Sequence, residues 1–296
     1  MIKTSLILCL LCLNVVLISC GGHTASKPVV VLDAESYTNE GMQAFAESNW
    51  QQARRSFTHA LLLYQGIDDQ QGVLQSHINL AEVALSVRDY QASQRHLDQA
   101  TDIIRTKSLS PYQQRIALLY ALQALQQKQI VQAEHLLLSL LPVFHNSTPL
   151  TIPDAIQMSA IANRTKIAFM NNQDEALWVL RYAKALKIYD IKDYDLEARL
   201  LRFQSSLLQS QGDYDASEAK LQQALSIYKD NFFRTGIAVT LFELGLLYMH
   251  QAQWQNAQDY FNRSIAVYHY LRDIDKVTQL TESLEKVELE LCKQAR

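Results

Sequence analysis

The sequence contains little glycine and proline. Eight glycines and five prolines among 296 residues amount to about 4% of the chain, where average usage gives about 12%. Glycine- and proline-rich sandwiches, barrels and long disordered linkers are therefore disfavoured, and an all-α protein is expected. Hydrophobic residues make up 48% of the chain, which is sufficient for a continuous core.

An excess of one charge is also missing. The 27 basic and 30 acidic residues leave a net charge of −3, and a nearly neutral chain is not typical of a nucleic-acid-binding protein. The chain lacks a glycine-rich phosphate loop and the H-E-x-x-H and G-x-S-x-G motifs, and its eight histidines are scattered. We therefore predict no enzymatic activity, no cofactor and no metal site.

A long apolar run occurs only near the start of the chain. Lys3 precedes thirteen residues, 6–18, which are apolar except for Asn14. This is the length of the apolar segment of a signal peptide and is too short to span a bilayer. Residues 1–19 are therefore predicted to be a signal peptide that is removed on export.

The end of this segment, Leu17-Ile18-Ser19-Cys20-Gly21, resembles the lipobox of bacterial lipoproteins. The resemblance implies that Cys20 becomes the mature N-terminus and carries fatty acyl chains such as palmitate, which anchor a protein firmly. The alternative is an ordinary secretory peptide in which Cys20 is incidental. In the lipoproteins that this motif resembles, Asp after the acylated cysteine favours the inner membrane. Gly21 therefore points to the outer membrane, facing the periplasm, with residues 20–33 as a flexible tether.

Cysteines cannot form a disulfide within the mature chain. Cys9 and Cys12 lie in the predicted signal peptide and Cys20 would be lipidated, which leaves Cys292 alone. Cys292 is interpreted as a partly buried apolar residue of a terminal helix, in preference to a site of intermolecular pairing.

A pattern of small and aromatic residues recurs along the rest of the chain, for example in Gly41, Trp50 and Phe57 and again in Gly245, Trp254 and Phe261. The small residue in the second half of each unit falls at Ala53, Ser93, Ala133, Ala176, Ser217 and Ala257. These spacings of 40, 40, 43, 41 and 40 residues are the strongest regularity in the sequence.

The repeats resemble tetratricopeptide repeats (TPRs), whose usual length is about 34 residues. The resemblance implies an all-α, right-handed superhelical solenoid of about six helix pairs, with small residues at close helix contacts and aromatic residues covering them. The expected pairs cover residues 34–72, 73–109, 110–150, 153–192, 193–232 and 233–273. The fourth copy departs most, because Arg164 stands where a small residue is usual.

Two segments interrupt or end this series. Pro142, Pro149 and Pro153 lie in one connection, which could be a hinge between two triplets of repeats; a rigid superhelix with a surface loop is the favoured alternative. Residues 274–296 have an apolar stripe at helical spacing, including Leu280 and Val287, and are predicted to form a capping helix with a polar outer face.

The first helices of TPRs line a concave groove, so the resemblance also implies partner-binding positions. These are Met42, Phe45, Ile78, Leu118, Leu122, Phe169, Arg199, Arg202, Phe242 and Met249. Such a surface suits a partner helix or strand that carries an acidic residue or a free carboxylate.

Two alternatives remain open for these positions. The apolar stripe could be core shared between helices, and the two arginines could pair with Asp193, Asp195 or Glu197 on their own helix or turn. Chaperone-binding members of the family clamp a carboxylate with Lys and Asn in the first repeat. The matching residues here are Thr38 and Met42, so that activity is not expected.

The sequence thus predicts a lipid-anchored scaffold or adaptor that binds protein or peptide partners in the bacterial cell envelope and assists assembly of an envelope machine. The alternative is a periplasmic receptor that binds a peptide or small signal in the groove. A closed groove would favour the receptor, whereas a broad, exposed groove would favour a protein partner.

Overall fold

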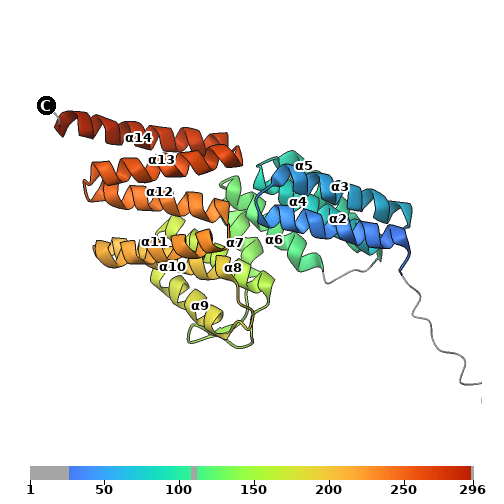
Figure 1. Cartoon of the computed structure of the whole chain (residues 1–296). Helices are drawn as coiled ribbons and strands as arrows, with labels where there is room; N and C mark the ends of the chain where they lie inside the picture. Colours follow the sequence, from blue (N-terminus) through green and yellow to red (C-terminus); the bar gives the residue numbers. More distant parts are fainter. Residues whose placement is uncertain (1–26, 108–111, 295–296) are drawn as a thin grey trace, which may run out of the picture.

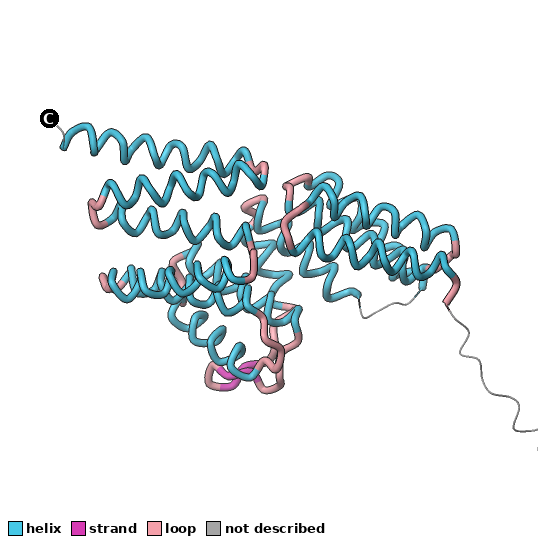
Figure 2. The backbone as a smooth tube through the Cα atoms, in the orientation of Figure 1, coloured by secondary structure: helices cyan, strands magenta, loops and turns pink. Residues whose placement is uncertain are grey.

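The protein is an α-solenoid. The computed structural model describes residues 27–107 and 112–294, and this part contains thirteen helices, in six successive antiparallel pairs and a last helix (Figures 1 and 2). The pairs are α2 (Val29–Ala46) and α3 (Trp50–Gly66), α4 (Gln70–Ser86) and α5 (Tyr90–Lys107), α6 (Gln113–Gln126) and α7 (Ile130–Leu138), α8 (Ala155–Asn171) and α9 (Glu175–Ile188), α10 (Tyr194–Ser210) and α11 (Tyr214–Asp230), and α12 (Arg234–His250) and α13 (Trp254–Leu271). Helix α14 (Ile274–Gln294) follows. The all-α solenoid prediction is confirmed.

Glycine and an aromatic ring meet at close contacts between paired helices, as the repeat pattern predicted. A Cβ atom added to Gly41 in α2 would lie 2.5 Å from the Phe57 ring in α3, and one added to Gly245 in α12 would lie 2.5 Å from the Phe261 ring in α13. Because real Cβ atoms do not approach so closely, any side chain here would push the helices apart. Phe57 and Phe261 are buried in the cores of the first and last pairs.

The connections between helices share one backbone conformation. In seven connections the middle of three residues has a positive φ: Ser48, Asp68, Arg88, Lys128, Gly212, Phe232 and Ala252. The left-handed conformation ends one helix, and in several connections the next residue caps the following helix. The side chain of Asn49, for example, accepts a hydrogen bond from the Gln52 amide. Only one of the seven is glycine, which is how a solenoid of short turns is built from a chain with little glycine.

The long connection between α7 and α8 contains a small hairpin, which sequence periodicity did not predict. Strands β1 (Phe144–His145) and β2 (Thr148–Pro149) pair antiparallel around Asn146 and Ser147, both of which have a positive φ. The hairpin packs on α9: the Phe144 ring meets the Trp178 ring edge-on at 6.4 Å, and Lys184 Nζ donates to the Asn146 carbonyl over 2.9 Å. These contacts fit the favoured interpretation of a surface loop on a rigid superhelix.

Arg164, the irregular residue of the fourth repeat, has an aromatic support. Its guanidinium group lies 4.6 Å from the centre of the Trp178 ring and pairs with Glu134 at 2.6 Å. The guanidinium of Arg181 lies 4.7 Å from the centre of the same ring. The larger residue is therefore accommodated by stacking and an ion pair between repeats.

The structure changes two expectations about the ends of the chain. The predicted signal peptide and Cys20 lie outside the described residues. The tether was expected to extend to residue 33, but α2 already begins at Val29, after Pro28, although Val29 and Leu32 are 73% and 48% exposed and the first buried residue is Ala34. Cys292, expected to be partly buried, is exposed on α14. Among the described helices, none is long and apolar enough to cross a bilayer.

The solenoid curves so that its two ends meet. Figure 1 shows helices α2–α5 beside the start of α12 and the turn between α13 and α14. Arg88, in the α4–α5 turn, pairs with Asp273 at 3.3 Å and with Asp275 at 2.8 Å, and Arg234 of α12 donates to the Glu47 carbonyl in the α2–α3 turn. We call this contact the closure. It joins the first two helix pairs to the last pair and α14.

Candidate binding site beside the closure

The predicted apolar groove is largely core. Ile78 is fully buried and Leu118 is buried as well, each in a cluster shared with neighbouring helices, so these two side chains are not available to a partner. Leu122, Phe242 and Met249 are half-buried against the same kind of clusters. The reason is geometric: adjacent first helices contact one another and cover the stripe that they share.

The other apolar positions also pack on neighbours, with one exception. The Phe45 ring meets Trp50 edge-on at 5.1 Å, and Phe169 of α8 stacks on Phe203 of α10 at 5.6 Å. Met42 is 54% exposed near the start of the solenoid. The structure therefore brings the ten predicted positions onto first helices but does not give a continuous apolar surface.

Arg202 is held by a neighbouring repeat. Its Nε and Nη2 atoms donate to the two carboxylate oxygens of Glu243 in α12, over 2.7 and 2.6 Å. Burial alone would lower the pKa of Arg202, but Glu243 and a hydrogen bond with Tyr228 raise it above its usual value. This partner was not among the carboxylates expected from the sequence. Arg202 is thus fixed in the contact between α10 and α12.

Arg199 is held more loosely. Its guanidinium lies 3.8 Å from Asp195 on its own helix, one of the partners considered from the sequence, and 3.4 Å from the Asn163 side-chain oxygen in α8. Distances of this length leave donor capacity on the guanidinium group for a further acceptor. Arg199 is therefore better placed than Arg202 to bind an acidic group.

Lys166 of α8 joins these arginines and was missed by the sequence analysis. Its side chain reaches solvent, but desolvation by the surrounding protein, together with Arg199, Arg202 and Lys276, lowers its pKa to about 8, against the opposing effect of Glu243. Burial and Arg88 likewise lower the pKa of Lys276 at the start of α14. The only sequence signal was that Lys166 lies one helical turn before Phe169 and therefore on the same face. We call Lys166, Arg199 and Lys276 the basic cluster.

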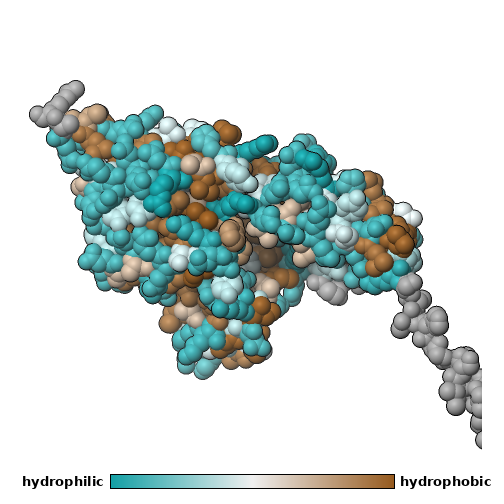
Figure 3. All heavy atoms as spheres, in the orientation of Figure 1, coloured by the Kyte–Doolittle hydropathy of each residue, from teal (hydrophilic) through white to brown (hydrophobic). Residues whose placement is uncertain are grey.

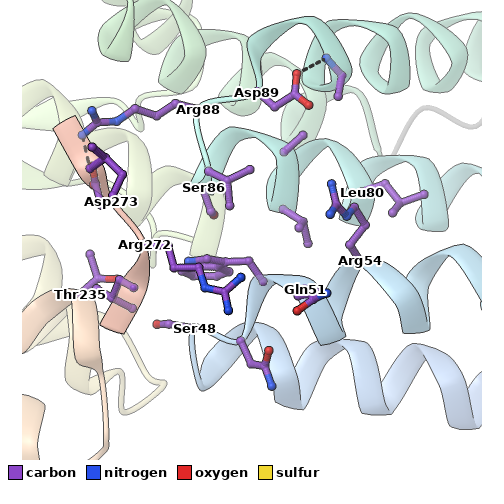
Figure 4. Close-up of a pocket in the computed structure, with 18 of the residues that line it drawn as sticks. Ser48, Gln51, Arg54, Leu80, Ser86, Arg88, Asp89, Thr235, Arg272 and Asp273 are labelled. Atoms are coloured by element: carbon purple, nitrogen blue, oxygen red, sulfur yellow. Dashed lines mark hydrogen bonds and ion pairs between the residues drawn. The ribbon is translucent and has the colours of Figure 1, made fainter. Parts of the chain in front are cut away.

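A cavity of about 750 Å³ lies at the closure itself, between α3 and α4 on one side and the α13–α14 turn on the other. Figure 3 shows the surface hollowed between the two ends of the solenoid, and Figure 4 shows Arg272 extending from the α13–α14 turn into this space. The charged residues of its wall are Arg54, Arg88, Asp89, Arg272, Asp273 and Asp275, and His96 also lines it.

The carboxylates of this cavity already have partners, whereas two of its arginines do not. Asp89 caps α5 through the Ala92 amide, and Asp273 and Asp275 pair with Arg88. Within residues 27–107 and 112–294, neither Arg54 nor Arg272 forms an ion pair. The wall thus holds three arginines and three aspartates, and Arg54 and Arg272 are its two cations without an ion-pair partner among the described residues.

Tyr268 connects the cavity with the basic cluster. It is a buried residue of the cavity wall, and burial raises the pKa of its hydroxyl to about 12. The charges that act on this hydroxyl come from both places: Arg202 and Glu243 on the first helices, and Asp273 and Arg88 at the closure. Arg202 also acts on Lys166, and Lys276 directly follows Asp275 of the cavity wall, so the basic cluster borders the cavity. In the described part of the chain, no three potential metal ligands are grouped together.

Comparisons with known proteins agree with this architecture. A family model of the tetratricopeptide repeat matches residues 32–106. A comparison with curated protein sequences found no match. Solved structures give similarity of fold: a Rap protein complexed with Competence and Sporulation Factor has a TM-score of 0.57 and 14% identity over 92% of this chain and 79% of that one.

Two further structures are similar. The apo form of RapI has a TM-score of 0.51 and 12% identity, covering 88% of this chain and 72% of that chain. A signal-transduction ATPase with a tetratricopeptide-repeat sensor from Pyrococcus horikoshii has a TM-score of 0.50 and 15% identity, covering 82% of this chain and 38% of that chain. The protein is therefore a TPR-like solenoid.

Proposed function

We propose that this protein is a peptide-binding scaffold that recognises an acidic group of its partner at the basic cluster. The observation that carries the proposal is the position of the basic cluster: Lys276 lies beside Arg88, Asp273 and Asp275, so the cluster borders the partly enclosed cavity of the closure. An enclosed site suits a short extended peptide better than a folded protein surface. The similar Rap structure, which was solved in complex with Competence and Sporulation Factor, supports this choice.

Recognition of an acidic group depends on which basic side chains still lack a close carboxylate partner. Arg202 donates both Nε and Nη2 to Glu243, so it stabilises the contact between α10 and α12. Arg199 and Lys166 have weaker or no carboxylate partners and can donate charge-assisted hydrogen bonds to a carboxylate. A bound carboxylate would also raise the lowered pKa of Lys166, because an opposite charge favours the ammonium form.

The location of this scaffold is a second part of the proposal. Its support is the lipobox-like sequence ending in Cys20, which would tether the solenoid to the outer membrane of a bacterial envelope. In that setting, the partner is a protein or peptide of the periplasm, and the scaffold assists assembly of an envelope machine or reports a peptide signal.

The experiment is affinity selection of random heptapeptides with free carboxyl-termini by the full chain, with the selected peptides identified by mass spectrometry. We expect enrichment of peptides with acidic side chains, and loss of that enrichment in a Lys166→Ala/Arg199→Ala variant. Amidated peptides distinguish a terminal carboxylate from an acidic side chain. Arg263→Ala is the matched control, because Arg263 pairs only with Asp259 on its own helix. No enrichment by the parent protein, or equal enrichment by the double variant, would overturn the proposal.

A further inference from the structure

A second pocket opens beside the start of α5 and has a different character. It occupies about 480 Å³ between the start of α5, the end of α6 and the start of α7. Its walls are formed by Tyr90, Gln91, Gln94, Tyr120, Gln123, Ala124, Gln127, Gln129 and Gln132. Six of these nine residues are glutamines, two are tyrosines, and no charged residue is among them. We call it the glutamine pocket.

Part of the wall is fixed by hydrogen bonds. Gln123 Nε2 donates to Gln94 Oε1 over 3.1 Å, and Gln94 Nε2 donates to Asp98 over 2.8 Å. The Tyr120 hydroxyl donates to the same Asp98 oxygen over 3.1 Å. Asp98, an exposed carboxylate outside the pocket lining, therefore orients these two side chains. The wall presents amide and phenol groups in set positions.

One acceptor in this wall is buried without a partner. Gln123 is almost completely buried, and its Oε1 atom accepts no hydrogen bond from any described residue. An unsatisfied buried acceptor costs free energy, so its retention calls for a donor from outside the chain. At the rim, Gln91, Gln127, Gln129 and Gln132 are exposed, and no side-chain hydrogen bond within the described residues engages Gln127 or Gln132.

We propose that the glutamine pocket binds an uncharged saccharide unit. Primary amides offer both donors and acceptors, which match hydroxyl groups that do the same, whereas an ionic ligand would find no counter-charge in this wall. The rings of Tyr90 and Tyr120 supply apolar surface for the C–H face of a sugar ring. A cavity of this size lies in the range of small-molecule sites and accommodates one or two sugar rings. The donor to Gln123 Oε1 is a sugar hydroxyl.

Saturation-transfer-difference NMR on the full chain tests this inference. The probes are two neutral disaccharides, N,N′-diacetylchitobiose and maltose, with glucuronate as an anionic comparison. We expect saturation transfer to at least one neutral disaccharide and little to glucuronate. Affinity is expected to fall about fivefold in Gln123→Leu, which removes the buried acceptor, because one hydrogen bond is lost.

Two further variants make the result decisive. Gln127→Ala changes only an exposed rim residue, so it keeps the test valid if Gln123→Leu perturbs folding, and it too should weaken binding. Gln222→Leu is the matched control, because Gln222 Nε2 donates to the Tyr260 hydroxyl over 2.9 Å on distant helices, and it should leave binding unchanged. Absence of saturation transfer from the parent to both neutral disaccharides, or binding that survives both pocket variants, would overturn the inference.

Discussion

Arg88 and Asp273 are 185 residues apart in the sequence, yet their side chains form an ion pair of 3.3 Å that joins the α4–α5 turn to the α13–α14 turn. Asp275 adds a second carboxylate at 2.8 Å from the same guanidinium. Arg88 is the left-handed residue of its turn, and Asp273 directly follows Arg272, the left-handed residue of the other turn. The solenoid is therefore closed by side chains that its own turns present.

Removing Arg88 should open the closure. Since the pair is partly exposed, Arg88→Ala is expected to cost only about 1 kcal/mol of stability, but it should increase the radius of gyration measured by small-angle X-ray scattering. High salt should have the same effect on the parent protein. Arg263→Ala, on one face of a single helix, should change neither quantity. An unchanged scattering profile for Arg88→Ala would show that the other contacts of the closure, among them Arg234 with the Glu47 carbonyl, hold the ends together.

Replacing Cys20 tests the location of the protein. In a bacterial host the parent chain should incorporate labelled palmitate and sediment with membranes, whereas Cys20→Ala should do neither, because no acyl chain can be attached. Cys292→Ala is the matched control, since this exposed cysteine lies at the other end of the chain. If Cys20→Ala remains with the membranes, the anchor lies elsewhere; if the parent is soluble and unlabelled, the motif is an ordinary secretory signal.

A buried histidine pair predicts acid sensitivity. His77 and His96 approach to 3.1 Å between their Nδ1 atoms, and burial together with His96 lowers the pKa of His77 to about 4 from a usual value of 6.5. Because the unfolded chain binds a proton at His77 more readily than the folded chain, stability is full above pH 6.5 and falls as pH decreases toward about 4.

The loss should be about 2 kcal/mol, since partial access of water reduces the full effect of the shift. The melting temperature measured from pH 7.5 to pH 4 checks this expectation. His77→Leu should remove most of the slope between pH 6.5 and pH 5, whereas His250→Gln, at an exposed position on α12, should keep it. A parent protein with a flat profile in this window would contradict a neutral histidine pair.

The repeat and helix pairing could be predicted because they depend on local, periodic contacts. The Gly41 and Phe57 pattern describes one helix contact, and it recurs with the period of the fold. The groove could not be predicted in the same way, because burial of Ile78 or Leu118 depends on how neighbouring first helices are rotated. The contact between Arg202 and Glu243 could have been predicted, because these opposite charges are 41 residues apart, which is one repeat length.

The closure is a different kind of contact. Its existence depends on small rotations that accumulate over five repeats, and no short stretch of sequence encodes their sum. The basic cluster shares this difficulty, since Lys166 and Lys276 are brought together by the curvature of the whole chain. The local pattern of residue types was therefore sufficient to predict the solenoid. The candidate site could not be predicted from it, because the site depends on the curvature of the whole solenoid.

The left-handed turn residues predict opposite effects of two reciprocal substitutions. Ala252 has a φ of 56° and carries a Cβ that disfavours this conformation, so Ala252→Gly should raise the free energy of unfolding by about 0.5–1 kcal/mol. Gly212 has a φ of 81°, and an added Cβ would meet nothing within 4 Å, so Gly212→Ala should lower stability by about 1 kcal/mol through the backbone alone. Urea unfolding of both variants, with an unchanged denaturant slope, measures these differences. If both changes prove destabilising, the Cβ of Ala252 must make a favourable contact that outweighs its backbone cost. The frequent use of non-glycine residues in these turns would then reflect side-chain packing.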